Sequence, residues 1–577
     1  MTFDPLVPRP IDLPTAIDGD LTAAKIIAAP TDPAEWPAWR DALTRWRKGA
    51  RDGYDGALYE RPEFSWTQSC FAVALVWLWD ELLYDFEAGQ FTPERLLAHG
   101  RDEFGGFDGV VLWHAYPVIG IDDRNQFDWY REVPGIRELV ASLRDAGVRV
   151  FVDYNPWDTG TRREPVDDAT AVAQIVAWLD ADGVFLDTLK EAPAELRAAL
   201  DAARPGVAFE GESTLPLARL ADHHLSWAQW FADSEVPGVI RARWFEQRHM
   251  LHATRRWNRD HSDELHTSWL NGTGMLIWEV VFGVWVGWNE RDKGLLRTML
   301  DVQRRHARLL THGEWTPLAA ASDGLEVVGS RWTLGGETLW AFVNRTDAPF
   351  AGTVAGAQLE LPAKGIAACE PDGRVVVSPG GSSSFPKRQA ERIDAPRVTV
   401  QAPPPDTAAL PAPGPQYAVF RRRETGTYDE APYVEEWKPL PPRLHDFIEV
   451  DRPPGRGRFA IALREEPLRG ATLDEARAHA ASRGARLPTE DEWQAAAAAG
   501  VLERAEPRVW EWTESEHRDG RTRFAILKGG ADHAVAGSDW YVDGGDVRPE
   551  RSLKLLLVGG SLQRSPSIGF RLAVDLP

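Results

Sequence analysis

Cysteine and long apolar runs are both scarce in this chain of 577 residues. Only Cys70 and Cys369 occur, too few for a disulfide framework. No run of about 18 apolar residues is present, so we expect no membrane-spanning helix. The first 20 residues carry acids and prolines without an apolar core. We therefore expect no signal peptide and a cytoplasmic location.

Basic charge is also in deficit. The chain has 65 Lys and Arg against 87 Asp and Glu, a formal net charge of −22. An acidic surface repels phosphate groups, so nucleic acids and anionic membranes are not expected as partners. A chain of 577 residues is too long for a single hydrophobic core, which predicts several domains.

Tryptophan, by contrast, is abundant, with 26 residues that lie mostly in the first 316 positions. Most of them are expected to fill the core. A few stand at the ends of predicted strands, where a flat aromatic face could stack on a sugar ring.

Apolar runs and amphipathic segments alternate from Phe71 onward. Strands are predicted around residues 71–79, 109–114, 148–152, 183–187, 206–212 and 275–278, and helices around 92–103, 135–146, 168–180, 192–204 and 289–310. Alternation of this kind with short loops predicts an α/β fold with a parallel sheet. About eight such units fit a closed (β/α)₈ TIM barrel, which we assign to residues 66–314.

The flanking segments differ in character. Residues 1–65 form a mixed N-terminal segment, and 315–395 show the short alternating strands of a small β-sandwich. Residues 396–415 are rich in Pro and Ala and read as a linker. Residues 416–577 form a further unit with helices predicted over 473–482 and 489–499.

Two consecutive predicted strands end on acids. Asp187 follows the fourth strand, and Glu212 follows the fifth. The carboxyl ends of barrel strands are where catalytic sites are built, and a pair of carboxylates is the machinery of glycoside hydrolysis. Asp187, near Lys190, would act as an ionised nucleophile and Glu212 as the general acid. The alternative for Asp187 is a helix N-cap.

Glu279, after the last predicted strand, is a rival for the role of acid. A carboxylate in so apolar a run is costly to bury unless it has a chemical purpose or a partner. An ion pair with an arginine that lies near it in space is the alternative interpretation. The sequence leaves both open.

Polar and aromatic side chains at the strand ends and in the loops after them are candidate sugar ligands. Glu210 lies deeper in the fifth strand and could orient the acid, since residues two apart share a face. The pair His249 and His252 has no matching carboxylate, so we expect no metal site and no cofactor. The substrate-binding candidates are Asp80, Trp113, His114, Tyr116, Asp123, Arg124, Asp153, Asn155, Trp157, Lys190, Glu210, His224, Trp227, Gln229 and Trp278.

Residues 70–215 resemble the α-amylase-like glycosidase barrels in several motifs that stand in the right order. The motif at 145–156 is similar to their third strand, the one at 185–190 to their nucleophile strand, and Gly211-Glu212 to their general acid. The resemblance implies a TIM barrel and a glycosidase activity. Phe185 stands where the family has an arginine, and its seventh-strand His-Asp pair is not found, so the chain reads as a relative in the wider group of barrel glycosidases.

Residues 416–577 resemble the formylglycine-generating enzyme family. The resemblance rests on four motifs, at 484–493, 509–513, 528–531 and 568–571. It implies a C-type-lectin-like α+β fold. The family's oxidase binds copper through a cysteine pair, yet this unit has no cysteine, so thiolate ligation is excluded. We expect Arg486, Glu490, Trp493, Trp510 and Trp512 to hold the fold, and the unit to pack on the barrel or on a second copy.

The sequence thus predicts a glycoside hydrolase, retaining in mechanism, that acts on a small carbohydrate or glycoside. One alternative is a non-catalytic carbohydrate-binding or sensory protein on a barrel scaffold. A second, disfavoured by the missing cysteines, is an oxygen-dependent oxidase in the C-terminal domain. Association of two copies through that domain is left open.

Overall fold

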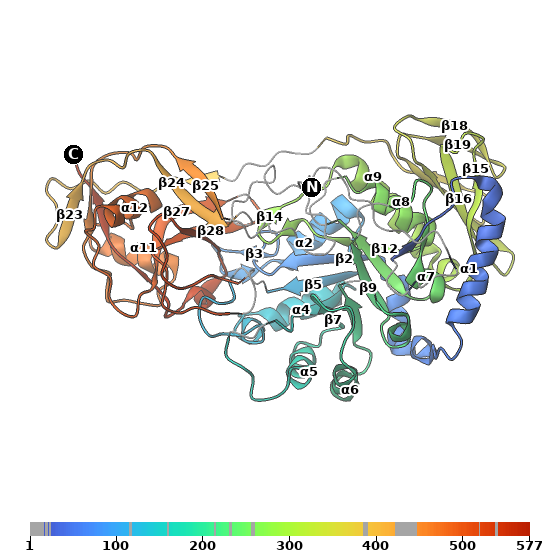
Figure 1. Ribbon diagram of the computed structural model, residues 1–577, viewed down its shortest axis with the longest axis horizontal. Coiled ribbons are helices and arrows are strands. Elements are labelled where there is room, and N and C mark those ends of the chain that lie inside the picture. Colours follow the sequence, from blue (N-terminus) through green and yellow to red (C-terminus); the bar gives the residue numbers. More distant parts are fainter. Residues whose placement is uncertain are drawn as a thin grey trace.

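A closed barrel of eight parallel strands forms the first half of the molecule (Figure 1). The structure is a computed structural model that describes residues 17, 21, 25–114, 118–157, 161–212, 215–229, 233–255, 260–384, 391–421, 447–518, 520–536 and 541–577. In chain order the barrel strands are β2 (Ala72–Trp77), β5 (Gly109–Trp113), β6 (Arg149–Tyr154), β7 (Gly183–Leu186), β8 (Ala208–Gly211), β9 (Leu225–Gln229), β11 (Met250–Thr254) and β12 (Gly274–Ile277). Pairing of β12 with β2 closes the barrel and confirms the predicted fold class.

Helices connect the strands on the outside of the barrel, close to the predicted positions. They are α2 (Pro93–His99), α3 (Asp128–Arg131), α4 (Ile136–Asp145), α5 (Asp168–Leu179), α6 (Ala194–Ala203), α7 (Arg241–Phe245), α8 (Ser262–Asn271), α9 (Glu290–Arg305) and α10 (Ala307–His312). Local capping explains several starts. Asp167 accepts a hydrogen bond from the Thr170 amide at α5, and Asn289 does the same for the Asp292 amide at α9. Such caps satisfy amides that the helix itself leaves unpaired.

The barrel interior is filled with side chains, and large residues stand opposite small ones. A Cβ atom added to Gly183 would lie 2.2 Å from the Phe151 ring, so the glycine makes room for this ring. The end where the strands begin is closed by the segment Pro62–Ser69, whose Trp66 packs edge-on against Phe151. In barrels of this kind active sites are built at the opposite end, where the strands finish.

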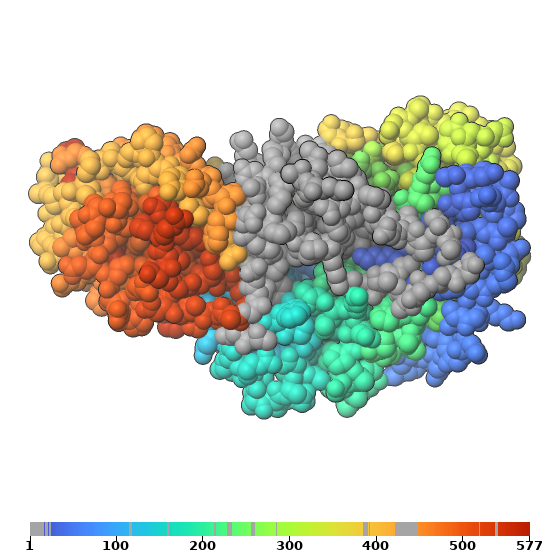
Figure 2. Space-filling model, viewed as in Figure 1, coloured from blue at the N-terminus to red at the C-terminus, as the bar shows by residue number. Residues whose placement is uncertain are grey.

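The N-terminal segment packs on the barrel and reaches the sheets that follow it. Strand β1 (Ile26–Ile27) pairs with β10 (Val239–Ile240). Helix α1 (Trp36–Ala50) lies beside the antiparallel sheets that begin at residue 314 (Figure 2). Arg40 of this helix donates a hydrogen bond of 2.8 Å to the Leu318 carbonyl in the first strand of these sheets.

Two antiparallel sheets follow the barrel. One contains β15 (Glu314–Ala321), β16 (Val327–Leu334), β17 (Glu337–Asn344), β20 (Ile366–Cys369) and β21 (Val375–Val377), and the other β18 (Phe350–Val354) and β19 (Ala357–Leu361). An apolar cluster lies between them, with Phe342 and Leu359 fully or almost fully buried. The indole N–H of Trp269, in α8, donates to the Phe342 carbonyl at 3.1 Å and ties these sheets to the barrel.

The C-terminal unit combines small sheets with two helices. Its main sheet contains β22 (Glu391–Ile393), β27 (Trp510–Arg518), β28 (Arg523–Lys528), β29 (Ser552–Leu556) and β30 (Ile568–Phe570). A second sheet contains β23 (Thr407–Leu410), β26 (Phe459–Ala462) and β31 (Ala573–Asp575), and β24 (Gln416–Arg421) pairs with β25 (Phe447–Arg452). The helices α11 (Leu473–Ser482) and α12 (Glu490–Ala498) each begin with a capping box.

Two of these strands lie outside the range predicted for this unit. Strand β23 is within 396–415, which reads as a linker, and β22 is within the range assigned to the sandwich. Both pair with strands of the C-terminal unit. The physical reason is that a few residues between prolines can still pair with the open edge of a sheet, because only the prolines lack an amide donor.

Candidate active site at the mouth of the barrel

Asp187 and Glu212 stand at the carboxyl ends of neighbouring barrel strands. Asp187 directly follows β7, and its amide donates to the Tyr154 carbonyl at 3.0 Å. Glu212 directly follows β8, and its amide donates to the Leu189 carbonyl at 3.1 Å. Both side chains are half-buried. The fourth and fifth strands of the barrel thus deliver the two acids to one part of the mouth.

Thr188 links the two acids through an unusual backbone conformation. Its φ angle is +61°, in the left-handed region that β-branched residues rarely adopt. In this conformation the Thr188 amide donates a hydrogen bond to the Glu212 carboxylate. Strain of this kind costs about 1–3 kcal/mol and persists where surrounding contacts impose it. Our sequence reading passed over Thr188, because residue type alone does not reveal a φ angle.

A second set of contacts holds Asp187 and Thr188 from the side of β6. The Asn155 amide group donates to the Asp187 carboxylate at 3.4 Å, and the Trp157 amide donates to Asn155 Oδ1 at 2.7 Å. The indole N–H of Trp157 donates to the Thr188 hydroxyl at 2.6 Å. The Trp157 side chain is nevertheless 53% exposed, so its ring is fixed at the edge of the site while much of it faces solvent.

Asp153 and His114 lie in the wall of the mouth and are buried. The Asp153 amide donates to the Tyr130 hydroxyl at 2.7 Å, and the Asp153 carboxylate is 3.5 Å from His114 Nδ1. The His114 ring stacks on Tyr130 with centroids 4.6 Å apart. Burial lowers the pKa of His114 to about 3, so this imidazole is neutral near pH 7. Its role in the wall of the mouth is to pack against Tyr130.

The opposite part of the mouth contains a buried ion cluster. Asp80, after β2, accepts two hydrogen bonds from Arg521, of 2.8 Å at Oδ1 and 2.6 Å at Oδ2. Glu279, after β12, lies 3.2 Å from the same guanidinium and 2.6 Å from His99 Nε2. Arg521 belongs to the C-terminal unit, 441 residues along the chain from Asp80, which is why sequence inspection missed it.

This cluster argues against Glu279 as the proton donor. Burial alone would raise the pKa of Glu279, but Arg521 and His99 outweigh it and hold this pKa at about 2. A carboxyl group with so low a pKa carries no proton to donate near neutral pH. Of the two interpretations that the sequence left open, the structure supports the ion pair. Asp80 is likewise held in an ion pair by Arg521.

The C-terminal unit covers the loops that follow β2, β5 and β12. The Glu81 amide donates to the Arg521 carbonyl at 2.9 Å, and the Thr522 hydroxyl donates to the Gly283 carbonyl at 3.1 Å. The Val542 amide donates to the Ile119 carbonyl at 2.9 Å. The predicted docking of this unit on the barrel is therefore confirmed, and Figure 1 shows it at the end opposite the sandwich.

Three of the predicted sugar platforms are core residues. Trp113, Trp227 and Trp278 are each less than 5% exposed. Their rings contact one another edge to face, with centroids 5.6 Å apart for Trp227 and Trp278 and 6.1 Å for Trp113 and Trp278. Inward positions of a barrel are filled by large side chains, and strand-end tryptophans in these strands follow that rule. These three rings are therefore packed in the core instead of lying on an open surface.

Glu210 lies inside the barrel below the mouth, paired with His252. The distance from His252 Nδ1 to the Glu210 carboxylate is 2.6 Å, and His252 Nε2 is 2.7 Å from the Cys70 carbonyl. Both partners are acceptors, so both ring nitrogens carry protons. Burial would lower the pKa of His252, but Glu210 outweighs it and raises this pKa. Glu210 serves this buried pair and does not contact Glu212.

The remaining candidates are scattered. Arg124 pairs with Asp122, lies over the Trp129 ring at 4.4 Å and donates to the Leu562 carbonyl at 3.1 Å, so it joins the two units. His224 stacks on Phe64 at 4.0 Å, at the closed end of the barrel. Both side chains thus make structural contacts, and their assignment to sugar binding stays a prediction. Asp123 and Lys190 are exposed. Tyr116 and the side chain of Gln229 lie outside the described residues.

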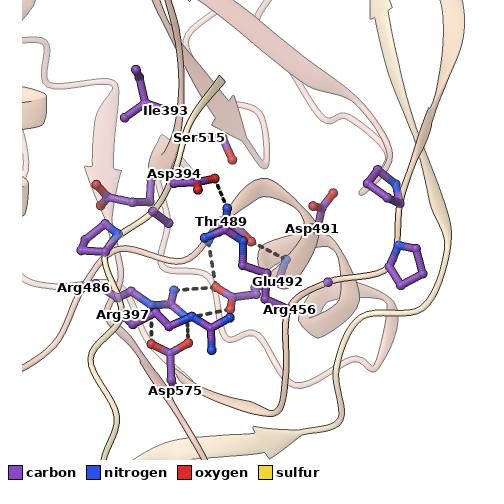
Figure 3. Close-up of a pocket in the computed structure, with 16 residues that line it drawn as sticks. Ile393, Asp394, Arg397, Arg456, Arg486, Thr489, Asp491, Glu492, Ser515 and Asp575 are labelled. Carbon is purple, nitrogen blue, oxygen red and sulfur yellow. Dashed lines mark hydrogen bonds and ion pairs between the residues drawn. The ribbon is translucent and has the colours of Figure 1, made fainter. Parts of the chain in front are cut away.

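The C-terminal unit has a cavity of about 190 Å³ of its own (Figure 3). Arg486 lies in its wall between two acids, 2.7 Å from Glu492 and 2.7 Å from Asp575. Glu490 pairs instead with Arg452 at 3.0 Å, and the indole N–H of Trp493 donates to Glu511 at 2.8 Å. These motif residues hold the fold, as the sequence predicted.

The described residues lack two kinds of feature. Among them, no group of three or more His, Cys, Asp or Glu side chains is arranged to hold a metal ion. In the same part of the chain, no helix is both long and apolar enough to cross a membrane.

Comparison with protein families supports the interpretation of the C-terminal motifs. The sequence profile described as the sulfatase-modifying factor enzyme 1-like domain matches residues 367–507. The match confirms the family resemblance of this region. It begins before residue 416 and ends at 507, so of the four motifs it includes only the one at 484–493. No curated protein matches the chain.

Among solved structures, the chain is similar to several glycosidases. A debranching enzyme of Nostoc punctiforme is 11% identical, with a TM-score of 0.35, over 52% of this chain and 98% of that one. An Anoxybacillus α-amylase is 12% identical, with a TM-score of 0.35, over 55% and 99%. An α-amylase of Geobacillus thermoleovorans is 13% identical, with a TM-score of 0.34, over 55% and 97%. Likeness of this degree carries no argument about the reaction.

Proposed function

We propose that the barrel hydrolyses a glycosidic bond, with Asp187 as the nucleophile and Glu212 as the general acid and base. One observation carries the proposal. The two carboxylates end neighbouring barrel strands, and the amide of Thr188, the residue after Asp187, donates to Glu212. A pair of acids at this end of a barrel matches the requirement of glycoside hydrolysis for one anionic group and one proton donor.

The geometry suits retention of configuration. In a retaining enzyme the two carboxyl groups lie about 5–5.5 Å apart, close enough for one to attack the anomeric carbon while the other protonates the leaving oxygen. The contact of Glu212 with the residue next to Asp187 supports such a short separation. Asp187 would form the glycosyl-enzyme bond as the aglycone leaves with the proton of Glu212. Glu212 would then deprotonate the water that breaks this bond.

Trp157 is the group best placed to bind the sugar ring. It is the predicted platform whose side chain remains largely exposed, at 53%. The hydrogen bond from its indole N–H to Thr188 places the ring beside the residue that follows Asp187. A flat, partly exposed aromatic face can stack on the apolar face of a sugar. A small glycoside is the substrate class that this arrangement favours.

Replacement of Asp187 tests the nucleophile. Asp187→Asn keeps the volume and removes the anion, so we expect kcat/KM on aryl glycosides to fall by about 10³-fold or more. Asp145→Asn, at the exposed end of α4, is the matched control and should behave as wild type. Screening α- and β-aryl glycosides identifies the substrate first. A variant that retains wild-type turnover would exclude Asp187 as nucleophile.

Replacement of Glu212 tests the acid by leaving group. Glu212→Ala should slow substrates with poor leaving groups far more than activated aryl glycosides, because only the former need the proton. The same series on Glu279→Ala should show no such dependence. The reverse pattern would transfer the role of acid to Glu279.

A barrel that binds carbohydrate without cleaving it is the second candidate. The observation in its favour is the locked state of Glu279, which leaves this third strand-end acid engaged by Arg521. Calorimetry with simple sugars separates the two functions. Binding to wild type and to Asp187→Asn, with no turnover of any glycoside in the panel, would establish the binding protein.

A further inference from the structure

Gln126 makes a two-point contact with the backbone of Asn155. It lies in the loop between β5 and α3 and is 2% exposed. Its side-chain oxygen accepts from the Asn155 amide at 2.9 Å, and its side-chain nitrogen donates to the Asn155 carbonyl at 2.6 Å. The side-chain amide of Gln126 thus bonds both the backbone N–H and the backbone C=O of Asn155. A residue of a neighbouring antiparallel strand would make the same two bonds.

The loop that carries Gln126 is itself fixed. The side-chain oxygen of Asn125 accepts from the amides of Phe127 and Asp128, each at 3.0 Å. The Asn125 side-chain nitrogen donates to the Arg162 carbonyl at 2.8 Å. Gln126 can hold Asn155 in place only if its own loop is fixed. The hydrogen bonds of Asn125 fix this loop.

The side chain of Asn155 then has one orientation. Its oxygen is occupied by the Trp157 amide at 2.7 Å, so its nitrogen faces the Asp187 carboxylate, at 3.4 Å. An amide group rotated by 180° would bring oxygen to the carboxylate and lose both contacts. Pro156 follows and restricts the backbone of Asn155 to extended conformations. With both backbone groups of Asn155 held by Gln126, the direction of its side chain is set.

The geometry points to Gln126 as a positioning residue for Asp187, acting through Asn155. The inference rests on the proposed function, because it assigns Asp187 a chemical role that its position must serve. The side-chain bonds of Gln126 to Asn155 place it one residue away from the Asp187 carboxylate in this chain of contacts. It acts on the reaction by keeping the Asn155 nitrogen at the Asp187 carboxylate, which fixes the direction from which this carboxylate meets the substrate.

Gln126→Glu is the decisive variant. It has the same shape and keeps the acceptor for the Asn155 amide, but it places an oxygen against the Asn155 carbonyl, where a donor stood 2.6 Å away. Because small displacements of a reacting group cost up to about 10²-fold in rate, we expect kcat to fall by about 10–100-fold while KM changes less than about 3-fold. Gln126→Met, uncharged and similar in length, should lower kcat in the same way and serves if the glutamate variant does not fold.

Gln247 provides the matched control. It is also a buried amide that donates to backbone carbonyls, those of Leu310 at 2.9 Å and Gly313 at 2.8 Å. It lies after α7, away from Asp187. Gln247→Glu should lower the melting temperature about as much as Gln126→Glu while leaving kcat and KM at wild-type values. A general loss of stability would affect both variants alike, and a positioning role affects only one.

The outcomes separate this inference from the proposed function. If Asp187→Asn is inactive but both Gln126 variants keep wild-type kcat, the positioning role is overturned and the function stands. If the wild type cleaves no glycoside, the function fails, and a crystal structure of Gln126→Met decides the inference. Asn155 Nδ2 still within hydrogen-bond distance of Asp187 overturns it, and an Asn155 side chain turned away from Asp187 supports it.

Discussion

Two parts of the barrel mouth carry acids at strand ends and use them differently. In the first, after β6, β7 and β8, Asp187 and Glu212 are half-buried and joined through Thr188. In the second, after β12 and β2, Glu279 and Asp80 are buried around Arg521 of the C-terminal unit. The comparison teaches that burial beside a guanidinium can hold a strand-end acid in its ionised form, as Arg521 does for Glu279.

The C-terminal unit makes this difference. Its Arg521 supplies the positive charge that two buried carboxylates require, since unpaired buried charge is very costly. Its loops also cover the strand ends around them, as the bonds to Glu81 and Gly283 show. The C-terminal unit, which has no cysteine, thus acts on the barrel through contacts. Its Arg521 pairs with two barrel acids, and the residues around Arg521 cover the neighbouring loops.

Removal of Arg521 should have the largest effect on stability, because it takes away the cation that distinguishes the second part of the mouth. Arg521→Gln leaves Asp80 and Glu279 buried without their cation, and breaking a buried pair in this way costs about 3–5 kcal/mol. We expect a large drop in melting temperature, measured by calorimetry. Arg508→Gln removes exposed ion pairs with Asp532 and Asp546 and should lower the melting temperature far less. A triple variant that also carries Asp80→Asn and Glu279→Gln should recover much of the loss, and a triple variant as unstable as Arg521→Gln would contradict the electrostatic explanation.

Acid should weaken the second part of the mouth. The pKa of Glu279 is depressed to about 2 from the ordinary 4.5, so its ion pair adds stability above about pH 4.5. This stability is lost as the pH falls toward 2 and amounts to roughly 3 kcal/mol. Glu279→Gln should therefore flatten the fall of unfolding free energy between pH 4.5 and 2. An unchanged pH profile in denaturant titrations of this variant would show that the pair contributes nothing.

Replacement of Trp157 tests whether the first part of the mouth, around Asp187 and Glu212, binds the substrate. Trp157→Ala should raise KM by about 3–10-fold, since aromatic contacts are worth about 0.5–1.5 kcal/mol beyond area burial. The effect on the melting temperature should be small. Trp178→Ala, which removes another exposed tryptophan on the outer helix α5, 37% exposed, should leave KM unchanged. Equal effects of the two variants on KM would remove Trp157 from the substrate site.

Replacement of Thr188 should have the smallest effect on stability. The order of stability of its glycine and alanine variants should be the reverse of the order in a helix. At a φ of +61°, Thr188→Gly should be more stable than Thr188→Ala by about 1 kcal/mol, because only glycine adopts this region without strain. At Thr298, within helix α9, the order should invert, with alanine more stable than glycine by a similar amount. Denaturant melts of the four variants measure both differences. The same order at both positions would refute the strain at Thr188.

The sequence was a good guide wherever the signal was local. Alternating apolar and amphipathic segments placed six of the eight barrel strands, since each period is set by neighbouring residues. The sequence placed Asp187 and Glu212 at the ends of β7 and β8 for the same reason. The strands β9 and β11 were not predicted, because the alternation blurs after Gly211. The sequence was a poor guide for Trp113 and Trp278, because a tryptophan at a strand end looks the same whether it faces a substrate or another ring.

What the sequence determined by itself is thus the position of six barrel strands and the residues at their carboxyl ends. Chain order fixes which strand ends are neighbours in a parallel barrel. Only the tertiary structure decided the state of each acid, because this depends on charges brought from afar. Arg521, 242 residues from Glu279 along the chain, holds that acid ionised. Thr188, one residue from Asp187, turns its amide to Glu212 through a conformation that only the folded chain imposes.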